Sequence, residues 1–200
     1  MKKWYLFIFI LTFLCFNSYA QQNIRHKGYE EFKEYRNSNE DKPKYLAKML
    51  TILADSSKLT NRQIINVQYH IGRLFEETGK PDSAIVYYDK MLKREPNYEV
   101  VHRALGFIYL ARTKVFVQEM NMASKEKNVE ANAKAYTNYK KLVVKAIPHL
   151  EKYQACSPDE ETLIIIENLY KSIKDTQSIA TIETRLKALS LNCVSLLEDE

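Results

Sequence analysis

Apolar residues recur at the three- and four-residue spacing of amphipathic helices along most of the chain. One such pattern runs from Pro43 to Leu53, and its shared face carries Tyr45, Leu46, Met49, Leu50 and Leu53. A charged helical stretch from Tyr29 to Tyr35 precedes it. We therefore expect an N-terminal helical cap over residues 29–60, after a mobile N-terminus at residues 21–28 that shows no periodicity.

Glycine and proline mark the expected helix ends. Gly79-Lys80-Pro81 places Gly just past one helix and Pro at the start of the next, which predicts a helical hairpin. Ser157-Pro158-Asp159-Glu160 is typical of a capping box with Pro158 at the first helical position, and it opens a helix on Leu163, Ile166, Leu169 and Tyr170. A partner helix from about Thr176 to Leu189 completes a degenerate C-terminal hairpin, with a solvated acidic tail, in residues 159–200.

Two sets of residues repeat at fixed displacements. Ile71, Gly72 and Phe75 return 34 positions later as Leu105, Gly106 and Tyr109. Ala84, Tyr88 and Pro96 return 62 positions later as Ala146, Leu150 and Pro158, so the second unit carries an insertion of 28 residues. A mid-helix glycine costs ~1 kcal/mol relative to alanine, and the missing side chain lets a facing helix approach closely.

The insertion is helical in character, because its apolar residues are spread through Lys, Glu and Asn without Gly or Pro. These apolar residues are Val115, Met120, Met122, Ala131, Ala135, Tyr139 and Leu142. If the insertion is divided equally, each helix gains about four turns of ~3.6 residues, so the apolar faces of both helices keep their orientation towards the core. The two lengthened helices then form an arm roughly 20 Å long. The alternative is a disordered loop extending beyond Ser124 to Val129.

The repeated positions resemble the tetratricopeptide repeat, whose pattern runs Leu-Gly-x-x-Tyr, then a small Ala, an aromatic residue and Pro. Residues 61–98 form the first unit and residues 99–158 the second, apart from the insertion. Gln68 and His102 stand where the family often has Trp, and Met91 and Tyr153 replace its second small residue. The resemblance implies an all-α, right-handed solenoid of antiparallel helix hairpins, one of them extended into a long protruding arm.

The resemblance also implies a binding groove on the first helix of each unit. The matching positions here are Asn66, Tyr69, Arg73, Val100, Arg103 and Phe107. Tyr69 and Phe107 would serve as apolar anchors and the two arginines as carboxylate contacts, and the alternative is a plain solvent-facing surface. Chaperone-binding members use Lys and Asn in a two-carboxylate clamp, from which Tyr69 and Arg73 depart, so binding of chaperone tails is not inferred.

Residues 1–20 have the three parts of a secretory signal peptide: Lys2-Lys3, an apolar run, and the small-x-small end Ser18-Tyr19-Ala20. We predict cleavage after Ala20 and a periplasmic or secreted protein. An uncleaved anchor is one alternative, although the run is shorter than the ~20 residues that a span needs. Lipid attachment at Cys15 is another, although the bulky Leu14 opposes it. No later segment could span a bilayer.

Composition narrows the class of protein further. Four glycines and five prolines disfavour sandwiches, barrels and Gly-rich nucleotide folds, and 46% hydrophobic residues exclude a wholly disordered chain. Without residues 1–20, 28 basic residues face 25 acidic ones, an excess of +3 that is too small to imply nucleic acid. Cys156 and Cys193 remain, and the sequence leaves open whether they form a disulfide or two separate thiols.

The chain lacks the local patterns of catalytic, cofactor and metal sites. Thr78-Gly79-Lys80 has Leu74 where a phosphate loop needs Gly, and the four histidines, His26, His70, His102 and His149, show no ligand spacing. The acidic clusters Glu76-Glu77 and Asp159-Glu160-Glu161 lie at helix ends, where solvated charge is ordinary. We predict no enzyme activity, no cofactor and no metal.

Stacked helical hairpins bind extended peptides or partner helices on their concave face. We therefore predict a non-enzymatic interaction module for a protein or peptide partner in the bacterial envelope. The Lys-, Asn-, Ile- and Tyr-rich composition and the signal end Ala-Gln-Gln resemble periplasmic repeat proteins of Bacteroidetes. The alternative is a structural protein that forms a homodimer through the arm.

Overall fold

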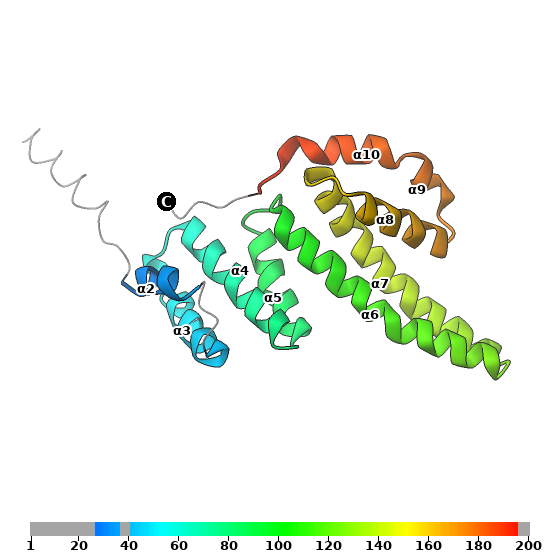
Figure 1. Ribbon diagram of the computed structural model, residues 1–200, viewed down its shortest axis with the longest axis horizontal. Helices are drawn as coiled ribbons and strands as arrows, with labels where there is room; N and C mark the ends of the chain where they lie inside the picture. The colour runs from blue at the N-terminus through cyan, green and yellow to red at the C-terminus, as the bar shows by residue number, and fades with distance from the viewer. Residues whose placement is uncertain (1–26, 37–40, 196–200) are drawn as a thin grey trace, which may run out of the picture.

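The computed structural model describes residues 27–36 and 41–195, which form helices joined by turns and a short C-terminal segment (Figure 1). The all-α prediction is confirmed. In chain order the helices are α2 (Lys27–Tyr35), α3 (Lys42–Ala54), α4 (Asn61–Glu77), α5 (Pro81–Leu92), α6 (Glu99–Lys125), α7 (Val129–Cys156), α8 (Glu160–Ser172), α9 (Thr176–Ala180) and α10 (Ile182–Leu189). Short 3-10 turns occur at Ser56–Lys58 and Ser190–Asn192.

Several predictions concern residues outside these ranges: the signal peptide at 1–20 with cleavage after Ala20, residues 21–26 of the N-terminus, and the acidic tail at 198–200. The predicted mobile segment covers residues 21–28, but Lys27 and Gly28 belong to α2. Burial of Tyr29 and Phe32 against α3 and α4 holds this first turn in place. None of the helices within the described ranges is both long enough and apolar enough to cross a membrane.

Helices α4 and α5 form a hairpin of the type that its glycine and proline predict. Thr60 begins α4 with a capping box to Gln63, Gly79 has a positive φ of 71° in the turn, and Pro81 is the first residue of α5. A Cβ atom at Gly72 would lie 2.5 Å from the Tyr88 ring, so the close approach of the two helices requires glycine there.

Helices α6 and α7 repeat this contact in a longer pair. Gly106 lies against Leu150, and an added Cβ atom would come within 2.6 Å of the Leu150 side chain. Leu105, Ala146 and Leu150 are fully buried, as Ile71, Ala84 and Tyr88 are in the first pair. Adding the displacement of 34 residues to the last residue of α4 gives Ala111, where α6 would end if it were as long as α4. Adding the displacement of 62 residues to the first residue of α5 gives Val143, where α7 would begin. Helix α6 continues past Ala111 to Lys125, and α7 begins well before Val143, at Val129.

The two extensions, residues 112–125 of α6 and 129–142 of α7, are called the arm below. The arm runs out from the body of the molecule to the lower right in Figure 1. Only residues 126–128 lie outside the helices, and the Asn128 side chain caps α7 by accepting from the backbone N–H of Ala131 at 3.0 Å. The described arm is therefore helical on both sides of a tight turn.

The start of α8 differs from the capping box expected at Ser157. Asp159 caps the helix, because its carboxylate accepts from the Thr162 N–H, while the Ser157 hydroxyl donates to Glu99 instead. Pro158 consequently lies before the helix and not at its first position.

The expected helix from Thr176 to Leu189 is not continuous. It breaks at Thr181 into α9 and α10. At the break, Arg185 donates hydrogen bonds to the Ser178 carbonyl and to the Thr181 hydroxyl. A side chain from the second segment thus satisfies polar groups at the end of the first.

The repeated prolines also behave differently from the other repeated residues. Pro96 and Pro158 are exposed, so they mark helix boundaries and do not pack between helices. Proline lacks a backbone N–H and restricts the residue before it, which is enough to explain its position between helices.

A C-terminal strap, residues 193–195, returns to the start of α6. A disulfide joins Cys193 to Cys156 at the end of α7, with 5.5 Å between their Cα atoms. The Val194 N–H donates to the Asn97 carbonyl, and the Val194 carbonyl accepts from the Glu99 N–H, both at 3.0 Å. Two residues far apart in sequence, Tyr98 and Val194, thus lie side by side.

Candidate functional site

A hollow of about 500 Å³ lies between α4 and the first turns of α6. Its lining residues are Tyr69, Arg73, Glu76, Glu77, Tyr88, Val100, Arg103, Ala104 and Phe107. Five of the six residues assigned to the groove from sequence lie on this surface. Tyr69 and Arg73 come from α4 and Val100, Arg103 and Phe107 from α6, so the two helices form one continuous surface, called the groove below.

Asn66 is the sixth assigned residue, and it does not belong to the groove. It is 5% exposed, and its Nδ2 donates to the Tyr29 hydroxyl oxygen at 3.1 Å. Helix α2 covers the N-terminal half of α4 and takes this side chain into the core. The assignment failed because the family pattern does not include this additional N-terminal helix.

Tyr69 forms the floor of the groove between the two helices. Its ring packs edge-on against Tyr98 at 5.7 Å between centroids and also contacts Tyr88 at 6.4 Å. Burial raises the pKa of the Tyr69 hydroxyl, so this group stays neutral at physiological pH and serves as a hydrogen-bonding group on an otherwise apolar floor.

The end of the groove nearest the C-terminus of α4 is already internally paired. Glu77 accepts ion pairs from Arg73 and Lys42, each at 3.0 Å, and Glu76 accepts a hydrogen bond from the Tyr88 hydroxyl at 3.0 Å. Burial raises the pKa of Glu77, but the hydrogen bonds from Lys42 and Arg73 outweigh it and leave that pKa below its usual value. Arg73 is thus engaged with a neighbour on its own helix.

Arg103 is the cation that the groove leaves open. Its guanidinium lies over the Phe107 ring at 5.3 Å and over the Tyr153 ring at 5.7 Å. It forms no ion pair with any residue of the described chain. Stacking on two rings holds the planar group in place while its N–H donors remain available to a carboxylate.

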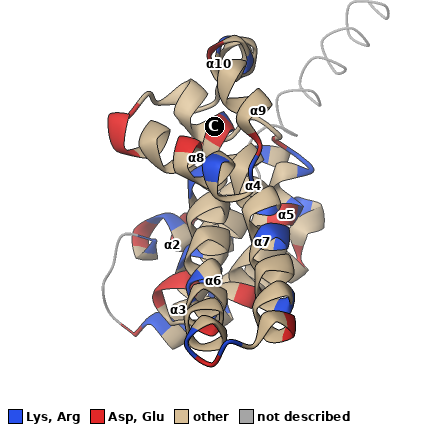
Figure 2. Ribbon diagram, turned by 90° about the vertical axis from the view of Figure 1, so that its right-hand side faces the viewer, with Lys and Arg blue, Asp and Glu red and all other residues tan. Residues whose placement is uncertain are grey.

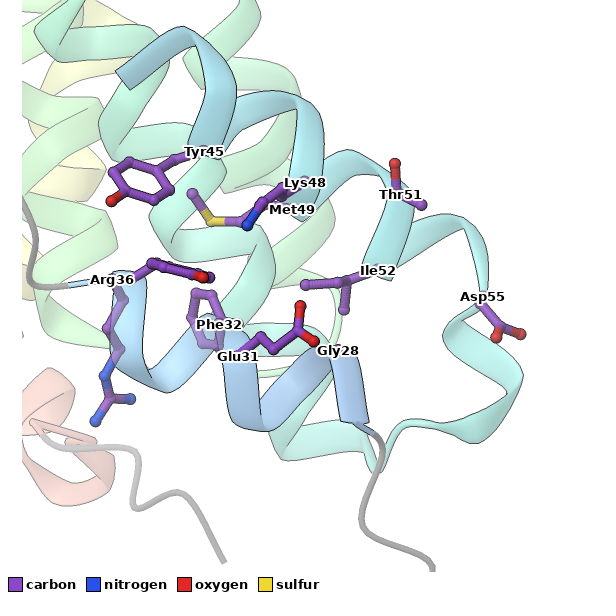
Figure 3. A pocket seen from close by; sticks show the side chains of 11 residues that line it. Gly28, Glu31, Phe32, Arg36, Tyr45, Lys48, Met49, Thr51, Ile52 and Asp55 are labelled. Carbon is purple, nitrogen blue, oxygen red and sulfur yellow. The ribbon is translucent and has the colours of Figure 1, made fainter. Parts of the chain in front are cut away.

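A second cavity, about 290 Å³, lies between α2 and α3, and no pattern in the sequence indicates it (Figure 3). Its apolar lining includes Phe32, Tyr45, Met49 and Ile52, and polar side chains such as Glu31 stand among them. Lys48 covers one side, with its Nζ 4.0 Å from the centroid of the Tyr35 ring. This space depends on how two short helices pack, which is a tertiary property.

Two histidines, His102 of α6 and His149 of α7, are in contact with each other. His102 Nε2 lies 2.9 Å from the Pro96 carbonyl oxygen, and His102 Nδ1 lies 3.0 Å from His149 Nδ1. A carbonyl oxygen only accepts, so Nε2 of His102 carries the proton and its Nδ1 accepts from the N–H of His149. Burial lowers the pKa of both rings, and that of His149 falls to about 4.

The described residues show no grouping of three or more His, Cys, Asp or Glu side chains that could hold a metal ion. The His102–His149 pair is a hydrogen-bonded contact in which the His149 ring stacks with Tyr109 at 6.1 Å. The acidic groups of the groove are occupied by the side chains of Lys42, Arg73 and Tyr88. The groove therefore combines an apolar floor with a guanidinium that two aromatic rings hold in place.

Comparison with known proteins gives little further guidance. No family model matches the chain, and no solved structure matches it. A curated protein from Guillardia theta described as "Uncharacterized protein ycf37" is 26% identical over 122 residues, a match that covers 52% of this chain and 67% of that protein. The chain is therefore similar to a protein whose printed name describes no activity.

Proposed function

We propose that this chain is a non-enzymatic protein–protein interaction module of the tetratricopeptide type, in which helix hairpins stack as a right-handed solenoid. One observation carries the proposal: five residues assigned by the repeat pattern line a single hollow between α4 and α6. The close contacts of Gly72 with Tyr88 and of Gly106 with Leu150, at equivalent positions of two helix pairs, support the repeat.

The groove fits an extended segment of a protein partner. An apolar side chain of that segment packs on Tyr69, Val100 and Phe107, and a carboxylate reaches Arg103. Aromatic residues and arginine are enriched at binding hot spots, because they combine a large contact area with directed hydrogen bonds. Arg73 contributes less, since a ligand would have to compete with Glu77.

The proposed location is the envelope of a bacterium, after export and removal of residues 1–20. The Cys156–Cys193 disulfide supports this, because disulfides form and persist in oxidising compartments and are rare in the cytosol. The resemblance of the sequence to periplasmic repeat proteins of Bacteroidetes points the same way.

Site-specific photocrosslinking in the native host tests the proposal. A benzoylphenylalanine at position 107 replaces a ring in the groove, and the same residue at Val86, which is 49% exposed on α5, serves as the matched control. We expect a discrete crosslinked partner from position 107 that Arg103→Glu abolishes, and none from position 86. Equal crosslinking from both positions, or a product that Arg103→Glu leaves unchanged, would rule out the groove as the binding site.

A second candidate function is self-association through the arm, for which its exposed apolar residues provide the reason. Met122 is 61% exposed and Val129 is 81% exposed at the tip. Sedimentation velocity on the purified chain distinguishes the two functions. A stable dimer that dissociates on Met122→Glu or Val129→Glu favours the structural role, whereas a monomer favours the adaptor.

A further inference from the structure

Within the described ranges, the outer part of the arm has no neighbouring helix other than its own partner. Figure 1 shows α8, α9 and α10 beside the inner part of α7, while the tip extends beyond them. The end of α8 meets α7 where the Tyr139 hydroxyl donates to Ser172 Oγ at 2.8 Å and the Tyr136 hydroxyl donates to the Ser172 carbonyl at 3.3 Å. On the exposed side of α7, Val129 and Ala133 lie towards the tip from this contact and Lys140 and Val144 lie on its body side, while Tyr136 is half-buried.

An apolar stripe follows this open side of α7. It consists of Val129, Ala133, Tyr136, Lys140 and Val144, with the aliphatic stem of Lys140 completing the row. The spacing of three or four residues keeps these side chains on one face over about four turns, or roughly 22 Å. Val129 is 81% and Val144 53% exposed, and two shallow hollows that share Tyr136 run along the stripe.

Unpaired lysines flank the stripe. Lys134 and Lys141 lie seven residues apart on α7, close to two helical turns, and Lys127 lies in the turn before that helix. None of the three forms an ion pair with any residue in the described ranges. In contrast, lysines of α2, α3 and α8 bind nearby carboxylates. The surface thus combines a helix-length apolar row with lysines that form no ion pair, and Glu130 lies four residues before Lys134 on the same helix.

We propose that this face of α7 is a second docking surface, which takes an amphipathic helix of an acidic protein partner. Small Ala133 at the middle of the outer half lets a second helix approach closely, and ridges at this spacing pack into the grooves of another helix. Acidic side chains beside the partner's apolar row meet Lys134 and Lys141. The surface lies on α7, whereas the groove lies between α4 and α6, so it does not depend on the groove being a binding site.

Two other occupants fit the arm less well. The tip of the arm would contact an anionic membrane first, and Glu126 and Glu130 lie among the lysines there, so the tip would not present a purely positive surface. Figure 2 shows acidic and basic residues side by side at that turn. A second copy of the arm would bring the lysine rows of both chains together, and like charges facing each other are destabilising. An acidic helix avoids both conflicts.

Fluorescence anisotropy with designed peptides tests this surface on the intact, disulfide-bonded chain. The probe is a stapled helix with Leu at positions i, i+4, i+7 and i+11 and Glu beside them, and the control peptide scrambles the same residues. Lys134→Glu/Lys141→Glu reverses the charge of the arm, and Lys90→Glu/Lys93→Glu makes the same change on α5 and its C-terminal end as a matched control. All four lysines are exposed, so the variants are expected to fold.

We expect saturable binding of the helix that weakens about tenfold or more with the arm variant, weakens with rising salt, and is unchanged by the α5 variant and by Arg103→Glu. Equal binding of the scrambled peptide overturns the proposal, as does equal binding by the arm variant. Tight binding to phosphatidylglycerol vesicles without peptide binding would replace the helix with a membrane. An arm-dependent dimer that does not bind the peptide would replace it with a second copy.

Discussion

Acidification from about pH 8 to about pH 5 is expected to destabilise the fold through the His102–His149 pair. Both rings are neutral in the folded protein, and His149 donates to the lone pair of His102. A further proton must therefore be held in a half-buried site beside a second imidazole ring. If both rings are charged, two N–H groups face each other across the 3.0 Å contact.

The magnitude follows from the shift at His149. Burial, and secondly the charge on His102, lowers its pKa from 6.5 to about 4. The unfolded chain therefore binds the proton more readily, so the contribution to stability is complete above pH 6.5, declines below it, and levels off below about pH 4. Linkage gives a loss of about 2 kcal/mol at pH 5 and about 3 kcal/mol at the acid limit.

Urea unfolding followed by circular dichroism at several pH values measures this loss. His149→Asn is the matched variant, because its side-chain amide can still donate to His102 but does not titrate. It loses the ring contact with Tyr109 and is less stable at every pH. The measured quantity is therefore the difference in pH dependence between the two proteins, in which the carboxylates that they share cancel.

The expected result is that the wild-type protein loses about 2 kcal/mol more than His149→Asn between pH 8 and pH 5. An NMR titration of the imidazole signals should place the pKa of His149 at about 4, below the ordinary value of 6.5. Parallel stability curves for the two proteins, together with an ordinary pKa for His149, would refute the assigned burial and hydrogen bonding.

Three substitutions probe the packing, the ion pair and the disulfide, all by urea denaturation. Gly106→Ala gains ~1 kcal/mol of helix propensity but places a methyl group against Leu150, so we expect the free energy of unfolding to fall by about 1–2 kcal/mol. A rise in the free energy of unfolding would mean that α6 and α7 are farther apart. Arg185→Met removes the cation from the buried carboxylate of Glu151, which then keeps the hydrogen bond from Tyr170, and should cost about 3–5 kcal/mol, most of which the added Glu151→Leu should restore. Cys156→Ser opens the link between residues 37 apart in sequence and should cost about 4 kcal/mol by loop-closure entropy; an unchanged stability would show that the strap stays in place without it.

The helices were predictable because their signals are local. Gly79 and Pro81 define one turn by backbone geometry alone, and an even division of the insertion keeps both apolar faces in register, which places the arm's turn at residues 126–128. The break at Thr181 was not predictable. It depends on hydrogen bonds from Arg185, which itself pairs with Glu151 on α7, a contact between residues 34 positions apart.

The groove was only partly predictable for the same reason. The repeat pattern predicts one side of α4 and α6 as the lining of a groove, and Tyr69, Arg73 and Phe107 on that side do line the hollow between the two helices. It does not show which of those residues another element covers, or which charges are already paired. Burial of Asn66 under α2 and the pairing of Arg73 with Glu77 both come from tertiary contacts, and these leave Arg103 as the available cation.

The C-terminal strap links the groove to the oxidation state of the protein. The disulfide holds Val194 against Tyr98, and the Tyr98 ring packs on Tyr69, which is the floor of the groove. Losing the bond removes the covalent link between the strap and α7. It leaves the two backbone hydrogen bonds of the strap, the packing of the Val194 side chain on the core beside Tyr98, and the contacts of Lys152 on α7 with the preceding carbonyls. We therefore expect Tyr69 to be fully ordered only in the oxidised chain, so that formation of the disulfide completes the floor of the groove.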